Sequence, residues 1–259
     1  MAVTSSMKVG ALMVVVLMVI GLPSGTNAQR WKGGAHITFY GSPNGGGTQA
    51  GACGYQNTYK LGYGSMTAAL SSPLFRGGSA CGACYQIRCA PVRRTRTARN
   101  WCYSYARTIT ITATNLCPPG STGGWCNPPR AHFDLPMPAF LTLARREGGV
   151  APVYYRKVRC AKRGGIRFTI GGNPWFLMVL IHNVGGAGDM RSVRVKGQYT
   201  NWYPMYRNWG ALWTVRTKLS GALSFAVTTS NGRTVVARNV VGKWWKFGQT
   251  WEARTNFRY

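Results

Sequence analysis

The chain has 259 residues, with 32 lysines and arginines against 4 acidic residues, and therefore a formal charge of +28. It is 45% hydrophobic and only 14% charged, with 10 tryptophans and 13 tyrosines, a composition that excludes a disordered polycation. The carboxylates are Asp134, Glu147, Asp189 and Glu252. Because calcium and two-metal centres need clustered carboxylates, we expect no metal site and no organic cofactor.

The first 28 residues have the pattern of a secretory signal peptide. Lys8 precedes the apolar run 11–22, Pro23 ends that run, and small residues at 26–28 predict cleavage before Gln29. The run is shorter than the roughly 20 residues that span a bilayer, so we expect a secreted chain without a transmembrane segment. Outside the cell, the positive charge favours an acidic polysaccharide or an anionic surface as partner over nucleic acid.

The cysteines divide the mature chain into two domains. All 8 lie between Cys53 and Cys160, and residues 161–259 contain none. An even number in a secreted chain predicts four disulfides, although eight cysteines allow 105 pairings. Because the two halves differ in how they are stabilised, we expect domains over 29–163 and 164–259.

Short β-strands are expected in both domains, because β-branched and aromatic runs alternate with turns rich in glycine and proline. The clearest is 108–115, which begins with threonine at every second position. One helix is expected over 138–147, ended by two glycines. The second domain shows only strand patterns, which favour a β-sandwich. The expected strands cover 37–40, 85–89, 108–115, 153–159, 166–170, 176–182, 192–196, 212–218, 223–229 and 234–241.

Motifs along nearly the whole mature chain resemble those of the plant alpha-expansins. They include TFYG at 38–41, GGWCNPP at 123–129, HFDL at 132–135, RGGIRF at 163–168 and NVGGAGD at 183–189. The resemblance implies an all-β protein, with a six-stranded double-psi β-barrel similar to that of family 45 glucanases. An immunoglobulin-like β-sandwich that binds cellulose would follow it. The resemblance also implies the disulfides Cys53–Cys81, Cys84–Cys160, Cys89–Cys102 and Cys117–Cys126.

The resemblance implies that a glucan groove crosses the barrel. Thr38 and Tyr40 alternate on one expected strand and therefore face the same side, and the family's groove combines them with Asp134. Considered without the family, Tyr40 suits the buried core better, and Asp134 could equally cap the helix that follows. His132 is expected to be a packed structural residue.

The carboxylates disfavour hydrolysis. Glycoside hydrolysis usually needs an acid and a second carboxylate, and the first domain has only Asp134 and Glu147. Glu147 is expected to pair with a neighbouring arginine in solvent, and Ala113 stands where some related proteins carry a second aspartate. We therefore expect a non-hydrolytic protein that lacks the second catalytic carboxylate.

Aromatic residues of the second domain are candidates for stacking on sugar rings. The resemblance places Phe176 and Trp213 on the cellulose-binding face, and Trp175 is a third candidate. Any single ring is more often part of the sandwich core, and we expect this of Trp209.

Two stretches depart from the family's pattern. The turn 42–48 lacks the usual aspartate, and the enlarged loop between Cys89 and Cys102 carries four arginines within 93–99. These arginines are either solvated charges or contacts for pectin carboxylates, whose strength would fall with salt.

The sequence therefore predicts a secreted, monomeric protein of the extracellular region and cell wall. It would disrupt non-covalent contacts between cellulose and matrix glucans without hydrolysis. The alternatives are a weak endoglucanase and a binding-only wall or defence protein.

Overall fold

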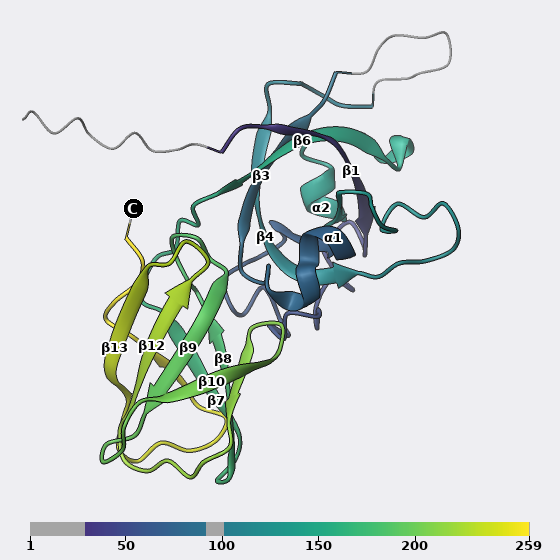
Figure 1. The fold of residues 1–259 in the computed structure, drawn as a ribbon. Coiled ribbons are helices and arrows are strands. Elements are labelled where there is room, and N and C mark those ends of the chain that lie inside the picture. Colours follow the sequence, from purple (N-terminus) through teal and green to yellow (C-terminus); the bar gives the residue numbers. More distant parts are fainter. Residues whose placement is uncertain (1–28, 92–100, 259) are drawn as a thin grey trace, which may run out of the picture.

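The computed structural model describes residues 29–91 and 101–258, drawn in colour in Figure 1. The expected signal peptide and the arginines at 93–99 lie outside these residues. The described chain is almost entirely β, as predicted, and forms a barrel followed by a second sheet domain. The expected boundary between residues 163 and 164 falls between the last barrel strand and the first strand of the second domain. No helix in the described ranges is long and apolar enough to cross a membrane.

The first six strands close into a barrel in the order β1-β5-β2-β4-β3-β6. Two of its pairs, β1 with β5 and β2 with β4, are parallel. The alternation of β4 has the expected cause, because Ile109 and Ile111 are buried while Thr108 and Thr110 are exposed. The strands are β1 (Lys32–Tyr40), β2 (Thr67–Ser71), β3 (Cys84–Cys89), β4 (Thr108–Cys117), β5 (His132–Pro136) and β6 (Ala151–Val158).

Helices are few and short. A four-residue helix α1 (Ser72–Phe75) runs into the 3₁₀ turn η1 (Arg76–Gly78). The helix expected over 138–147 is wrong in extent, since α2 (Met137–Phe140) has only four residues and the 3₁₀ turn η2 (Arg146–Gly148) follows separately. Backbone bonds to another segment explain the early end: Tyr103 N–H donates to Leu143, and Arg145 N–H donates to Trp101.

The four disulfides join the pairs that the resemblance implies, and all lie within the barrel or at its end. Cys84–Cys160 closes the longest loop, with a sequence separation of 76. It joins the start of β3 to the segment that leaves the barrel, so it fixes the point from which the second domain begins.

The second domain is a β-sandwich built from one continuous strand order, β13-β12-β9-β10-β11-β8-β7-β14. The two ends of this order face each other, because the rings of Phe168 in β7 and Phe225 in β12 stack at 4.5 Å between centroids. Both rings are fully buried. The strands are β7 (Arg167–Asn173), β8 (Phe176–His182), β9 (Met190–Lys196), β10 (Tyr203–Trp209), β11 (Leu212–Val215), β12 (Leu223–Thr229), β13 (Thr234–Val241) and β14 (Thr250–Glu252).

The two domains are joined by close backbone contacts. Figure 1 shows the barrel above the sandwich. The Ala211 N–H donates to the Cys53 carbonyl at 3.0 Å. Gly188 approaches Gly82 so closely that a Cβ on Gly188 would lie 2.2 Å from the Gly82 carbonyl oxygen. Only glycine permits this approach, and the resulting contact fixes the orientation of the sandwich on the barrel.

Candidate functional site

Three residues of the barrel form one chain of hydrogen bonds. Thr38 in β1 lies opposite Asp134 in the parallel strand β5, and its hydroxyl donates to Asp134 Oδ1 at 2.6 Å. The other side of that hydroxyl contacts His132 Nε2 at 2.8 Å. A threonine hydroxyl has one proton, so His132 must donate from Nε2 when Thr38 donates to an ionised Asp134. We call Thr38, Tyr40, Asn115, His132 and Asp134 the Asp134 cluster.

Asp134 is not a helix cap. The N-cap position of α2 is Pro136, and no side chain bonds to the free N–H groups there. Asp134 instead lies inside β5, opposite Ala69 of β2 as well as Thr38 of β1. The capping alternative is therefore wrong.

Burial sets the protonation of the cluster. Burial raises the pKa of Asp134 above its usual value, and the hydrogen bond from Thr38 opposes this shift. Burial lowers the pKa of His132 to about 4, with further lowering from the charges of His36 and Arg130. In mildly acidic solution, His132 is therefore neutral while Asp134 retains a proton more readily than an exposed aspartate.

Tyr40 supplies a neutral phenol beside these groups. It is half-buried and lies two positions after Thr38, on the same side of β1. Burial raises the pKa of Tyr40 to about 12, against the opposing influence of the nearby Asn115 amide. The cluster therefore offers an acid, a phenol and an amide, the kinds of group that hydrogen-bond sugar hydroxyls.

His132 is packed, as expected, and is fully buried. Its bond to Thr38 joins it to the cluster, which the sequence did not predict. Trp125 stacks on its ring at 6.1 Å between centroids and carries the guanidinium of Arg130 at 5.3 Å. Trp125 of the GGWC motif thus contacts the cluster through its ring.

The other positions where a groove carboxylate could stand hold uncharged residues or lie outside the barrel strands. Ala113 is fully buried in β4. Glu147 is exposed in η2, and among the described residues it forms no salt bridge, so its expected pairing with an arginine is wrong. The turn at 42–48 is closed by neutral groups, with Thr48 Oγ1 donating to the Gly45 carbonyl at 2.7 Å.

Trp213 does not lie on the surface of the sandwich. It is 3% exposed and lies opposite Val179 of β8, whose side chain is fully buried. Side chains at paired positions share one face of a sheet, so Trp213 points into the core. The Arg207 guanidinium stacks 4.4 Å from its ring centre. The expected surface position of Trp213 is therefore wrong.

The outer face of the same strands carries other aromatic rings. Trp175, in the turn between β7 and β8, is 70% exposed, and the neighbouring Phe176 is half-buried. Tyr206 of β10 is also 70% exposed and lies opposite Thr214, which in turn lies opposite Met178. Tyr206 belongs to the aromatic stretch of 202–213 but is not among the expected binding residues. No strand is expected at 203–209, so the outward side of this stretch was undefined.

Trp209 is expected in the core, and this expectation is also wrong. It is 47% exposed. A register shift between Arg207 and Trp209 turns it out of the alternation of β10. Its ring lies against the barrel, since a Cβ on Gly54 would lie 3.2 Å from it. Trp209 therefore connects the aromatic outer face of the sandwich with the barrel.

Comparisons with known proteins match both domains. The family model of the expansin C-terminal domain matches residues 166–242, and a model described as lytic transglycolase matches residues 67–155. Expansin-A25 of Oryza sativa subsp. japonica is 48% identical over 250 residues, which cover 94% of this chain and 96% of that protein. Expansin-A22 of Arabidopsis thaliana is 52% identical, covering 86% and 78% of the respective chains.

The chain belongs to the plant alpha-expansins. It is accordingly a cell-wall-loosening protein that acts without an enzymatic step, as predicted from the sequence.

A bacterial expansin shares the fold. The crystal structure of the apo expansin of Clavibacter michiganensis matches with a TM-score of 0.66 and 22% identity, covering 87% of this chain and 97% of that one. A variant of the same protein was solved in complex with cellohexaose and matches with a TM-score of 0.66 and 21% identity. In this plant expansin, as in its bacterial neighbour, barrel and sandwich occur together in one chain.

Proposed function

We propose that this expansin loosens the wall by holding a glucan strand at the Asp134 cluster while the outer face of its sandwich rests on cellulose. The observation that carries the proposal is the hydrogen-bond chain His132–Thr38–Asp134, which presents a carboxyl group with a raised pKa beside Tyr40. The cellohexaose complex of the bacterial neighbour supports a glucan as the ligand.

The sandwich contributes attachment through aromatic rings. Trp175 and Phe176 keep the binding role that the sequence assigned to them, and Tyr206 joins them on the same outer face. Flat rings stack on the apolar faces of pyranose units, and such contacts bury large areas at low entropic cost. Trp213 supports this face from inside the sandwich.

No covalent step is proposed. Asp134 can donate a hydrogen bond or a proton to a glucan, but the barrel offers no second carboxylate beside it: Ala113 is apolar and Glu147 is exposed in η2. An acid without a base does not activate water effectively. Loosening then follows from tighter binding to a separated glucan strand than to a strand packed on its neighbours.

The remaining expectations complete this proposal. We propose a protein secreted after removal of residues 1–28, monomeric, with domains over 29–163 and 164–259 and a location in the extracellular cell wall. Matrix glucans are its further partners, and acidic pectin is attracted by its basic surface. The arginines at 93–99 are one candidate for that attraction.

The experiment is a creep assay with reducing-sugar analysis in the same bath. Heat-inactivated wall strips are held under constant load at acidic pH, and the purified protein is added. We expect extension without sugar release. Sugar release in proportion to protein would favour the endoglucanase alternative. Intact cellulose binding without extension would favour a binding-only protein.

A further inference from the structure

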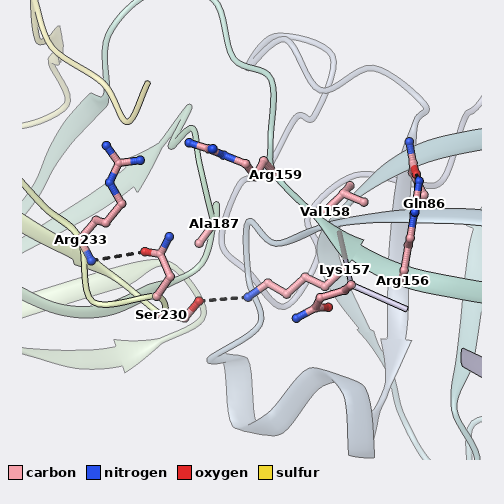
Figure 2. Close-up of a pocket in the computed structure, with 10 residues that line it drawn as sticks. Gln86, Arg156, Lys157, Val158, Arg159, Ala187, Ser230 and Arg233 are labelled. Atoms are coloured by element: carbon pink, nitrogen blue, oxygen red, sulfur yellow. Dashed lines mark hydrogen bonds between the residues drawn. The ribbon is translucent and has the colours of Figure 1, made fainter. Parts of the chain in front are cut away.

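An open cleft lies where the barrel meets the sandwich (Figure 2). Its volume is about 720 Å³, within the range of small-ligand sites. Strand β6 and the residue after it, Arg159, form one wall, and Ala187 with the hairpin between β12 and β13 forms the other. The cleft shares no lining residue with the Asp134 cluster or with the aromatic outer face, so it is a separate site.

Cationic groups dominate the lining of this cleft. Lys157 Nζ lies 2.6 Å from Asp189 Oδ1, and this buried carboxylate offsets its charge. Arg156 and Arg233 form no salt bridge with a carboxylate of the described residues. Their guanidinium groups donate to neutral oxygens, the Gln86 side chain and the Arg258 carbonyl. Arg156 and Arg233 therefore bring positive charge to the cleft that no acidic side chain in the described part of the chain offsets.

These guanidinium groups are oriented before a ligand arrives. Arg156 donates from Nε and Nη2 to Gln86 at 2.8 and 2.6 Å, and its guanidinium stacks 4.6 Å from the ring centre of Trp31. Arg233 of the sandwich and Arg159 of the barrel side both donate to the Arg258 carbonyl. Figure 2 shows Arg159 and Arg233 converging from opposite walls. Such restraint lowers the entropic cost of binding, and the planar fork of arginine matches a carboxylate.

We propose that this cleft binds carboxylate groups of an acidic polysaccharide, with Arg156 and Arg233 as the principal contacts. Gln29, Ser230 and Asn231 line the same space and can hydrogen-bond ring hydroxyls. A polyuronate suits the site better than a single anion, because cationic groups on both walls can meet successive carboxylates of one chain. The choice of a wall polysaccharide rests on the proposed function.

The test measures binding of a de-esterified oligogalacturonide to the mature full-length protein by calorimetry, at low and at physiological ionic strength. The double variant Arg156→Gln/Arg233→Gln should bind about tenfold more weakly, because two charge-assisted contacts are lost. The matched control is Arg146→Gln/Arg238→Gln, which also removes one arginine from each domain and leaves the cleft intact; both of these arginines are exposed. Its affinity should change less than about twofold.

Several outcomes would overturn the proposal. Equal weakening in both double variants would show diffuse attraction by the net charge only. A fully methyl-esterified oligomer should not bind, and binding of that oligomer would exclude carboxylate recognition. Cleft-dependent binding of inorganic phosphate without binding of the oligogalacturonide would point to a free anion as the ligand.

Folding and function are monitored separately. Near-UV circular dichroism and cellulose binding should be unchanged in both double variants, and single variants of Arg156 and Arg233 replace a double variant that loses its fold. Wall extension without oligogalacturonide binding would contradict carboxylate binding by the cleft and would leave the proposed function unaffected. Oligogalacturonide binding without extension would support the cleft proposal and contradict the proposed function.

Discussion

The Thr38 hydroxyl donates to Asp134 across two parallel strands and at the same time contacts His132, 94 residues away in sequence. When Asp134 takes up a proton, it can donate to Thr38. Thr38 can then donate to Nε2 of a neutral His132, provided that the ring changes tautomer and carries its proton on Nδ1 instead. The direction of the hydrogen-bond chain therefore follows the protonation of Asp134. This couples the state of the acid to a fully buried ring.

Removing the Thr38 hydroxyl should move the pH dependence of loosening. The Thr38 hydrogen bond lowers the pKa of Asp134 against the effect of burial, so Thr38→Val should raise that pKa further. If the protonated acid is the active form, activity falls as pH rises through this pKa, and the fall in Thr38→Val should occur at higher pH. Thr38→Ser retains the hydroxyl and should keep the wild-type profile. Creep rates measured across the acidic range check this.

Asp134→Asn provides the complementary measurement. Asparagine cannot titrate in this range, so whatever extension remains should be independent of pH. Full activity of Asp134→Asn at every pH would remove Asp134 from the mechanism, whereas loss of cellulose binding would reveal a misfolded protein.

Variants of the exposed and the buried aromatic residues of the sandwich should separate cellulose binding from protein stability. Trp175→Ala and Tyr206→Ala remove rings that are each 70% exposed, so cellulose binding should weaken with less than about 0.5 kcal/mol of lost stability. Trp213→Ala empties a core position and should cost about 3–5 kcal/mol in the free energy of unfolding. Pull-down on cellulose and urea denaturation measure the two quantities. Weakened binding in a fully stable Trp213→Ala protein would contradict the inward orientation.

Trp213 also shows what the sequence alone could not decide. An aromatic stretch between 202 and 213 indicates that some rings face outward, but the choice depends on register. Pairing with Val179 sends Trp213 inward, and the pairing of Tyr206 with Thr214 sends Tyr206 outward. The shift after Arg207 then exposes Trp209. Register is a property of two strands together, so a pattern read along one strand leaves it undetermined.

The architecture could be predicted from the sequence, because the patterns that indicate it are local or belong to the family motifs. The alternation of β4 and the hairpin between β12 and β13 are visible in short windows of sequence. In contrast, four strands were missed: β2, β5, β10 and β14. Of these, β2 (TAALS) is rich in alanine, and β10 contains Pro204 and the polar pair Arg207 and Asn208. Both become strands because neighbours pair on each side. The contact between Thr38 and His132 has no local signal at all.

Acid should weaken the fold through its buried histidines. Burial lowers the pKa of both His132 and His182 to about 4. Between pH 6.5 and 4 the unfolded chain binds more protons than the folded one, so the free energy of unfolding decreases as pH falls through this window. The loss approaches about 3 kcal/mol for each histidine.

His182→Leu tests this, because His182 is 1% exposed and lies outside the Asp134 cluster. The variant should lose less stability than the wild type between pH 7 and pH 4.5 in urea denaturation. An unchanged pH slope would show that His182 is not neutral in the folded protein.

The ion pair of Asp189 should hold the two domains together. Asp189 is 1% exposed and accepts from Lys157 at 2.6 and 2.7 Å and from Ser230 at 2.7 Å. Asp189→Asn leaves Lys157 without its counter-charge, and breaking a buried pair costs about 3–5 kcal/mol. Calorimetry should show a lower melting temperature, with the unfolding of the sandwich separating from that of the barrel.

Glu252→Gln is the matched control for Asp189→Asn, because its pair with Arg167 lies at the surface, with the two side chains 42% and 34% exposed. Exposed pairs contribute less than about 1 kcal/mol, so this variant should melt close to the wild type. Equal losses in the two variants would mean that burial at the domain junction adds nothing to the pair. A single unshifted transition in Asp189→Asn would assign the rigidity of the junction to the backbone contacts of Gly82 and Gly188 instead.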